Sequence, residues 1–315
     1  MVSPFERLLL TGAGGGLGRV LRPHLRQWSR VARVSDRVDC GTPVAGEEVV
    51  LADLENATAV HALLEGVDAV LHFGGISLEA PFEQLVPANI VGLYNLYQAA
   101  HRHKVRRVVY ASSSHVVGFY RQSETIGIDV PLRPDCLYAV TKCFGEALSR
   151  YYFDRFGIET VCLRIGSSFP EPKNPRMMVS YLSYDDLVEL VRCALFTPRV
   201  DHSIIYGSDN TVKWWDNARA THLGFHAGDS SRRFEDRFPA SGPMDSAPEH
   251  VFQGGPWVLS EPLEPRLRDP SGLPRHRFCK RRKQNAFDKT IFNSPNPRFD
   301  GFAHTGCLWW RQFRR

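Results

Sequence analysis

The sequence predicts an α/β fold built on a doubly wound, parallel β-sheet. Three observations lead to this prediction. A short apolar strand runs into a glycine-rich turn, strand and helix patterns alternate regularly after it, and polar residues directly follow the strands in sequence. The 315 residues, of which 43% are hydrophobic and 23% charged, suffice for a complete α/β core with a small additional lobe.

The glycine-rich turn lies between a predicted strand at residues 7–11 and a predicted amphipathic helix at residues 17–28. Gly12, Gly15 and Gly18 permit a tight turn and let the backbone approach a phosphate closely. The free amides and the dipole of the following helix favour an anion. This segment therefore predicts a binding site for a pyrophosphate.

Asp36 extends this prediction to a dinucleotide. It follows the second predicted strand, residues 31–35, and lies 21 residues after Gly15. Dinucleotide-binding folds place a carboxylate for the adenosine ribose at about this distance. A carboxylate there repels a 2′-phosphate and so favours NAD over NADP, a preference that the neighbouring Arg37 weakens.

Strands and helices alternate along the rest of the chain, the strands as short apolar runs and the helices as longer segments with apolar residues three or four positions apart. Strands are predicted at residues 7–11, 31–35, 48–52, 69–73, 107–111, 159–164 and 202–206. Helices are predicted at residues 17–28, 57–64, 87–103, 137–156 and 184–196, the last with Ser183 as its N-cap. Ligands of such sheets bind beyond the carboxyl ends of the strands, where this chain carries Asp53 and Leu54, Gly74 to Ser77, Ser112 to His115, and Gly166 to Ser168.

Tyr138 and Lys142 are the candidates for chemistry. They lie four residues apart in a predicted helix, so both side chains project from one face. A tyrosine acts as a base near neutral pH only if a cation stabilises its phenolate, and Lys142 and an oxidised nicotinamide would supply that charge. Ser113 would hold a substrate hydroxyl whose proton Tyr138 removes while hydride leaves the same carbon.

This constellation resembles the extended short-chain dehydrogenase/reductase family and, within it, the uronate dehydrogenases. The resemblance is carried by the turn from Thr11 to Gly18, the serines after the fifth strand and the segment from Tyr138 to Lys142. Further matching segments are residues 74–77, 89–97, 164–167, 171–177, 214–217 and 252–255, so the resemblance extends from about residue 7 to residue 255.

The resemblance implies a Rossmann-like fold with a small C-terminal substrate lobe, and the NAD-dependent oxidation of the anomeric hydroxyl of galacturonate or glucuronate to the aldarolactone. The catalytic set would be Ser113, Tyr138, Lys142 and Asn89, the last supporting the lysine through water. NAD would be bound by Gly12, Gly15, Gly16, Leu17, Gly18, Asp36, Asp53, Leu54, Phe73, Gly74, Gly75, Lys142 and Ser168. The hexuronate would be bound by Ser77, Ser113, Ser114, His115, Tyr138, Ser167 and Arg176, whose planar charged fork suits a carboxylate.

Two of these positions depart from the family. Ser114 stands where the family has asparagine and Ser168 where it has cysteine, and these departures bear on the preferred sugar rather than on the reaction type. Simpler roles remain open for three others: His115 as a packed residue, Ser77 as the cap of a turn and Arg176 as an exposed loop residue. Trp214 and Trp215 are interpreted as packing residues.

Two other functions remain open. A sugar-nucleotide epimerase or dehydratase of the same family would use the same tyrosine and lysine, but the region after the sixth strand is short for a nucleotide diphosphate. A regulator that senses NAD without turnover tends to lose the tyrosine, and this chain retains Tyr138, Lys142 and Ser113.

We expect two regions, an NAD-binding domain at residues 1–257 and a tail at residues 258–315 that lies outside the family pattern. The substrate lobe would be embedded in the first, mainly at residues 167–183 and 207–257. The tail carries 13 Lys and Arg against 5 Asp and Glu and lacks apolar periodicity. We interpret it as a disordered or aberrant extension that adds little to stability, with nucleic-acid binding as a weaker alternative.

The cysteines, the apolar runs and the N-terminus predict the location and the redox state of the protein. Its seven cysteines are scattered without the spacing of a metal or redox motif, so we expect reduced thiols and no metal. No apolar run approaches the length of a membrane span, and the N-terminus lacks the features of a signal peptide. These observations predict a cytoplasmic protein without a membrane partner, and we expect a homo-oligomer.

Overall fold

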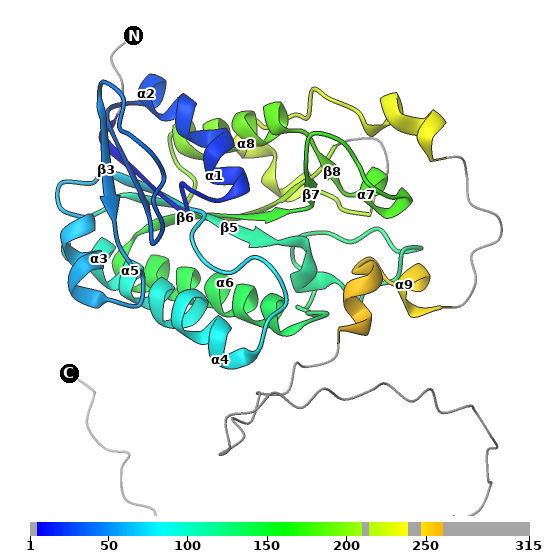
Figure 1. The fold of residues 1–315 in the computed structure, drawn as a ribbon. Coiled ribbons are helices and arrows are strands. Elements are labelled where there is room, and N and C mark those ends of the chain that lie inside the picture. Colours follow the sequence, from blue (N-terminus) through cyan, green and yellow to red (C-terminus); the bar gives the residue numbers. More distant parts are fainter. Residues whose placement is uncertain (1–4, 210–213, 239–246, 261–315) are drawn as a thin grey trace, which may run out of the picture. The chain divides into compact units, whose positions relative to one another are not determined.

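The computed structural model describes residues 5–209, 214–238 and 247–260, in which a seven-stranded sheet carries helices on both faces (Figure 1). All neighbouring strands are parallel, in the order β3-β2-β1-β4-β5-β6-β9. The strands are β1 Phe5–Thr11, β2 Ser29–Asp36, β3 Glu47–Leu51, β4 Ala69–His72, β5 Arg107–Ser113, β6 Glu159–Ile165 and β9 His202–Gly207. The predicted doubly wound, Rossmann-like sheet is confirmed, with every predicted strand present.

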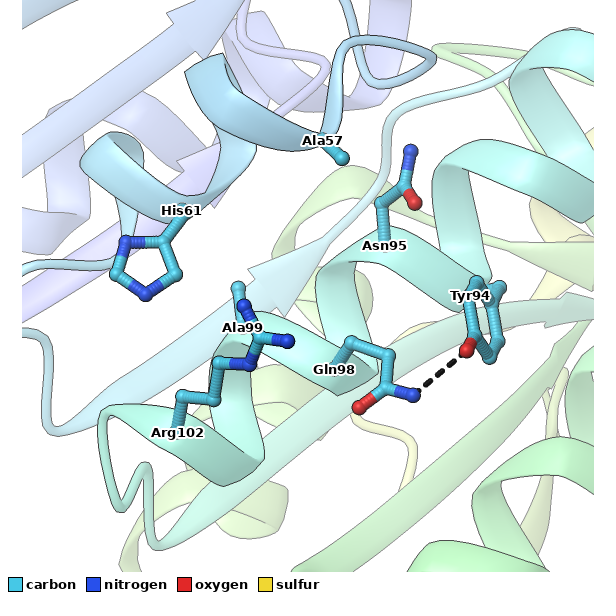
Figure 2. A pocket seen from close by; sticks show the side chains of 7 residues that line it. All are labelled: Ala57, His61, Tyr94, Asn95, Gln98, Ala99 and Arg102. Carbon is cyan, nitrogen blue, oxygen red and sulfur yellow. Dashed lines mark hydrogen bonds between the residues drawn. The ribbon is translucent and has the colours of Figure 1, made fainter.

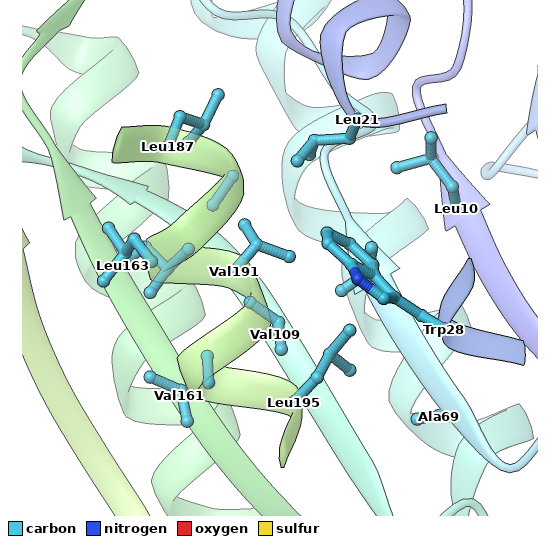
Figure 3. Packing of buried hydrophobic residues seen from close by; sticks show 14 of the residues in the cluster. Leu10, Leu21, Trp28, Ala69, Val109, Val161, Leu163, Leu187, Val191 and Leu195 are labelled. Carbon is cyan, nitrogen blue, oxygen red and sulfur yellow. The ribbon is translucent and has the colours of Figure 1, made fainter. Parts of the chain in front are cut away.

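Alternating side chains of the strands build one apolar layer on each face of the sheet. In β1, Leu8 and Leu10 pack into one cluster and Leu9 into the other, as the two-residue period of a strand requires. The first cluster lies under α1 Gly16–Leu21, α2 Leu25–Trp28 and α8 Tyr184–Phe196, whose side chains meet over the sheet in Figure 3. The second lies under α3 Ala57–Leu63, α5 Gly92–Arg102 and α6 Leu137–Phe156 (Figure 1).

Two helix predictions need correction at prolines. The segment predicted as one helix at residues 17–28 is divided by a 3-10 turn at Arg22–His24, which contains Pro23. The helix predicted at residues 87–103 begins earlier, with α4 Phe82–Leu85, and continues through a π-helical turn at Val86–Val91 into α5. Proline lacks the amide proton that a regular α-helix needs, so each of these segments changes its hydrogen-bonding pattern there.

The other helices follow the predicted boundaries. Helix α6 covers residues 137–156 as predicted and ends at Gly157, which has a left-handed φ of 73°. Helix α8 covers residues 184–196 as predicted, and the Ser183 hydroxyl accepts a hydrogen bond from the Asp186 amide at 3.0 Å. Ser183 is therefore the N-cap that the sequence predicts.

The region after β6 contains smaller elements. A parallel pair of two-residue strands, β7 Ser167–Ser168 and β8 Tyr181–Leu182, was not predicted, and α7 Pro175–Val179 lies between them. Trp214 and Trp215 are buried in an apolar cluster with Tyr206, which confirms their interpretation as packing residues. Helix α9 Pro248–Val251 and a 3-10 turn at Gly255–Leu259 follow.

Of the tail predicted at residues 258–315, only residues 258–260 are described, and residues 261–315 lie outside the described part. Within the described ranges, no helix is both long and apolar enough to cross a membrane.

Candidate active site

The carboxyl ends of the central strands bring the candidate residues to one edge of the sheet. Thr11 of β1 is in register with His72 of β4, although 61 residues separate them, and Ser113 of β5 is in register with Ile165 of β6. The glycine-rich turn, the segment after β4 and the segments after β5 and β6 therefore begin side by side. This edge includes the point where the strand order reverses, the usual ligand site of such sheets.

The glycine-rich turn is tightly packed against the segment after β4. Gly12 has a φ of 75°, and a Cβ at this position would lie 2.5 Å from the carbonyl carbon of Phe73. A Cβ at Gly18 would overlap the carbonyl oxygen of Gly12. Both positions thus require glycine. Gly15 immediately precedes α1, which begins with Gly16 and Leu17.

Asp36 is the last residue of β2 and Asp53 follows two residues after the end of β3, and the two have different surroundings. The Asp36 carboxylate accepts hydrogen bonds from the amides of Gly14 at 3.0 Å and Arg37 at 2.7 Å. It therefore links the glycine-rich turn to the end of β2. Asp53 is exposed and accepts from the Glu55 amide at 3.1 Å, which makes it part of a local turn. The neighbouring Leu54 is half-buried and borders Gly74.

Ser113, Tyr138 and Lys142 lie together in the buried part of this edge. Burial raises the pKa of Tyr138 above its usual value, and the nearby side chain of Ser113 opposes this rise. The Lys142 ammonium donates to the carbonyl of Ala111 at 2.8 Å and lies 5.6 Å from the centre of the Tyr138 ring. Burial lowers the pKa of Lys142 to about 8.

Asn89 lies next to this group in the π-helical turn. Its carboxamide accepts from the Ile76 amide at 2.8 Å and donates to the Ile76 carbonyl and to the Thr141 hydroxyl, both at 2.9 Å. A Cβ at Gly75, which has a φ of 124°, would lie 2.7 Å from the Asn89 side chain. The described contacts of Asn89 thus connect the segment after β4 to α6. In α6 they reach Thr141, which precedes Lys142 in sequence, and not Lys142 itself.

The remaining predicted serines differ in burial. Ser114 and Ser167, predicted for the substrate, and Ser168, predicted for NAD, are buried, and the Ser167 hydroxyl lies 2.8 Å from the Ser180 hydroxyl. The Ser168 hydroxyl is buried without a hydrogen-bond partner in the described residues. Ser77 is exposed, and among the described residues no helix has it as a cap.

His115 contacts a carboxylate that the sequence analysis missed, and the charge of this carboxylate also acts on Arg176. The Nδ1 atom of His115 lies 2.7 Å from an oxygen of the fully buried Asp135. Arg176 is half-buried and belongs to α7 rather than to an exposed loop, and its Nε donates to the carbonyl of Gln253 at 2.7 Å. Burial lowers the pKa of Arg176 to about 10 and the Asp135 charge opposes this shift, so Arg176 stays cationic near pH 7.

Three further residues of the site received no role from the sequence, although one of them, Gln253, lies in a segment that resembles the family. The Trp257 ring lies 4.4 Å from the His115 ring and 6.0 Å from the Tyr138 ring, measured between centroids. The Glu79 carboxylate accepts from the first two amides of α6, those of Leu137 at 3.1 Å and Tyr138 at 2.8 Å. The third is Gln253, described above. A carboxylate ahead of a helix is a recognisable cap only when it is adjacent in sequence, and Glu79 is 58 residues away.

A surface pocket lies elsewhere, between α3 and α5 (Figure 2). It is lined by Ala57, His61, Tyr94, Asn95, Gln98, Ala99 and Arg102, and the Gln98 amide donates to the Tyr94 hydroxyl at 2.6 Å. None of the candidate site residues lines it, so we do not assign it to the site.

The sequence pattern of the NAD dependent epimerase/dehydratase family matches residues 8–195. The chain belongs to this family. The matched range includes the glycine-rich turn, Ser113, Tyr138, Lys142 and Arg176.

Within this family, the chain is similar to proteins named for uronate oxidation. It is 53% identical to the uronate dehydrogenase of Pseudomonas syringae pv. tomato, over 83% of this chain and 96% of that protein. A crystal structure of a glucuronic acid dehydrogenase from Chromohalobacter salexigens matches with a TM-score of 0.80 at 43% identity, over 83% of this chain and all of that one. A mutant of the uronate dehydrogenase from Agrobacterium tumefaciens, complexed with NAD, matches with a TM-score of 0.78 at 43% identity, over 82% and 98% of the two chains.

The residues present fit the dinucleotide for which the epimerase/dehydratase family is named. Gly12 and Gly18 let the turn pack closely against Phe73 and onto itself, a Cβ at Gly16 would have no protein atom within 4 Å, and the Asp36 carboxylate lies beside the turn. The buried hydroxyl of Ser168, which has no hydrogen-bond partner among the described residues, is a polar group that a ligand can satisfy.

Proposed function

We propose that this protein oxidises the anomeric hydroxyl of a cyclic hexuronic acid, D-galacturonate or D-glucuronate, to the aldarolactone with NAD as the oxidant. The observation that carries the proposal is that one short segment, from Gln253 to Trp257, contacts both the cationic fork of Arg176 and the Tyr138 ring. Gln253 binds Arg176, and Trp257, four residues further on, contacts the rings of His115 and Tyr138. A sugar that carries a carboxylate can therefore engage Arg176 while its reacting end faces the tyrosine.

In the proposed mechanism, Ser113 and Tyr138 hold the C1 hydroxyl of the sugar. Tyr138 takes the hydroxyl proton, the electron pair of the C1–H bond leaves as hydride, and the C1–O bond becomes the carbonyl of the lactone. NAD, when bound, supplies the hydride acceptor and a positive charge near the tyrosine. The products are then the lactone, NADH and a proton.

Lys142 makes Tyr138 usable as a base. Burial alone disfavours the phenolate, so the tyrosine needs positive charge nearby. The protonated Lys142 side chain provides it from 5.6 Å, and its hydrogen bond to Ala111 fixes the ammonium in place. Asn89 holds Ile76 and Thr141 around this lysine, and Glu79 anchors the first turn of α6, which carries the tyrosine.

The remaining substrate residues would orient the sugar. Arg176 would bind the carboxylate, and Ser77, Ser114, His115 and Ser167 would contact the other oxygens. Ser168 would face the nicotinamide end of the cofactor, because its buried hydroxyl has no other partner within the described structure. Gly12, Gly15, Gly16, Leu17, Gly18, Asp36, Asp53, Leu54, Phe73, Gly74, Gly75 and Lys142 would surround the rest of NAD.

The proposal is tested by mixing the purified protein with NAD and each uronate and following NADH by its absorbance. We expect net NADH formation with galacturonate and glucuronate. An epimerase or dehydratase regenerates its NAD and produces no net NADH, and a regulator produces none with any sugar. Folded protein that reduces no NAD with either uronate would contradict the proposal.

Asp36→Ala is expected to weaken the preference for NAD over NADP. The carboxylate accepts from the ribose hydroxyls and repels the 2′-phosphate, and a hydrogen bond to a charged group contributes about 1.5–3 kcal/mol. We therefore expect the ratio of the two dissociation constants to fall by about tenfold or more. Titrations of both cofactors measure it, with Asp39→Ala as the control, because Asp39 is exposed and its carboxylate accepts from the nearby Gly41 amide. An unchanged ratio would mean that another group reads the ribose.

The proposal includes a reducing, cytoplasmic setting and a homo-oligomer. All five described cysteines, Cys40, Cys136, Cys143, Cys162 and Cys193, are free thiols, as is usual in a reducing compartment.

Large side chains with apolar rings are exposed on α5 and α6, among them Tyr94 and Tyr151, which supports a contact between subunits.

A further inference from the structure

Asp135 is a buried carboxylate that the mechanism above does not use. Its side chain has no solvent exposure, and one of its oxygens, Oδ2, lies 2.7 Å from Nδ1 of His115. The Asp135 amide also donates to the His115 carbonyl at 3.3 Å. Two contacts therefore connect Asp135 to the same residue, and the second carboxylate oxygen, Oδ1, is buried without a hydrogen-bond partner in the described chain. Burial of a charge is costly unless it has a specific partner.

The surrounding backbone is shaped to admit this carboxylate. A Cβ at Gly118 would overlap Oδ2 of Asp135, and so would a Cβ at Gly254. The two glycines come from segments 136 residues apart and are joined by a hydrogen bond from the Gly254 amide to the Gly118 carbonyl at 2.8 Å. Space for Asp135 thus depends on glycine on both sides.

The contact determines which nitrogen of His115 carries a proton. A carboxylate only accepts hydrogen bonds, so the 2.7 Å contact requires the proton on Nδ1. The Trp257 ring, 4.4 Å away, restricts rotation of the imidazole. The other nitrogen, Nε2, has no hydrogen-bond partner in the described part of the chain, and the His115 side chain retains 12% exposure.

We propose that Asp135 is a positioning residue that holds His115 in the Nδ1-protonated tautomer, so that Nε2 accepts a hydrogen bond from a hydroxyl of the hexuronate. This inference rests on the proposed function and assigns a chemical role to one substrate contact. Arg176, which is also within the electrostatic reach of Asp135, donates to the sugar carboxylate, whereas His115 accepts from a hydroxyl. The pocket then distinguishes the charged end of the sugar from its hydroxyl-bearing face.

The tautomer is measured without reference to activity. Long-range 1H–15N correlation spectra of 15N-labelled protein at pH 8 report which nitrogen of each histidine is protonated, and the His115 signal is identified by its loss in His115→Gln. We expect a proton on Nδ1 and an unprotonated Nε2. In Asp135→Asn we expect the Nε2-protonated form to appear, because a neutral amide no longer disfavours it. A wild-type signal with the proton on Nε2 would overturn the proposal.

A double-mutant cycle then tests whether Asp135 acts through His115. We expect Asp135→Asn to lower kcat/KM for uronates by about tenfold, mainly through KM, and the loss to be at least about fivefold smaller in the His115→Gln background. Any effect of Asp135 on Arg176 or on folding is present in both backgrounds and cancels. Equal losses in the two backgrounds would contradict the proposal.

Two measurements separate the possible failures. Asp129→Asn, an exposed carboxylate between the same β5 and α6, serves as the matched control and should leave kcat/KM unchanged. If the wild-type protein oxidises no uronate, the proposed function fails, and the NMR result still decides the Asp135–His115 arrangement.

Discussion

Replacing Tyr138 with phenylalanine is expected to lower kcat for uronate oxidation by about a hundredfold to ten-thousandfold, the range typical of a lost general base. The variant keeps the ring that lies 6.0 Å from Trp257, measured between centroids, and removes only the hydroxyl. The dissociation constant of NAD and the melting temperature should therefore change little. Steady-state NADH formation, a fluorescence titration with NAD and a thermal melt measure the three quantities.

Tyr151→Phe is the matched control for this variant. Tyr151 lies in the same helix, α6, and its side chain is exposed, so removal of its hydroxyl should leave kcat unchanged. If Tyr138→Phe keeps more than about a tenth of the wild-type kcat, another group acts as the base. If it loses NAD binding as well, the hydroxyl has a role in forming the cofactor site.

Arg176→Ala is expected to raise KM for both uronates strongly while the dissociation constant of NAD stays nearly constant. Removal of one partner from a buried, charged hydrogen bond costs about 2–5 kcal/mol, which corresponds to at least about a thirtyfold change in affinity. The guanidinium is already half-buried and fixed by the Gln253 carbonyl, so little ordering is left for the substrate to impose. Kinetics at saturating NAD with each uronate measure the effect.

Lys173→Ala removes the same charge from the same segment and serves as the control. Lys173 is exposed, and its ammonium lies over the Phe169 ring at 4.6 Å. A comparable rise in KM in both variants would indicate a long-range effect of charge rather than a contact of Arg176 with the carboxylate. A normal KM in Arg176→Ala would show that Arg176 does not bind the substrate.

Local patterns were sufficient to predict the regular elements and the residues that lie within one element. Helices α6 and α8 have the predicted bounds because their ends are marked by residues that are adjacent in sequence, such as Ser183 and Gly157. Tyr138 and Lys142 could be paired because a helix repeats every 3.6 residues. The prolines at positions 23 and 87 were local signals too, and their effect on the helices was overlooked.

The contacts between distant segments could not be predicted in this way. Glu79 caps a helix from 58 residues away, and Gln253 joins Arg176 across 77 residues. A side chain in a connecting segment has no periodicity, so nothing in its sequence neighbourhood indicates its partner. Asp135 is the clearest case, because its role depends on space left by Gly118 and Gly254.

The sequence by itself therefore determined the doubly wound sheet and the glycine-rich turn with Asp36, and it singled out Ser113, Tyr138 and Lys142 as the proposed catalytic residues, since each of these follows from spacing along the chain. Only the tertiary structure decided which residues complete the candidate active site. It brings Asp135 into contact with His115, joins Arg176 to Gln253 by a hydrogen bond and places the Trp257 ring beside the His115 ring. The physical reason is that these side chains are selected by shape and charge in three dimensions, where residues from four separate segments meet.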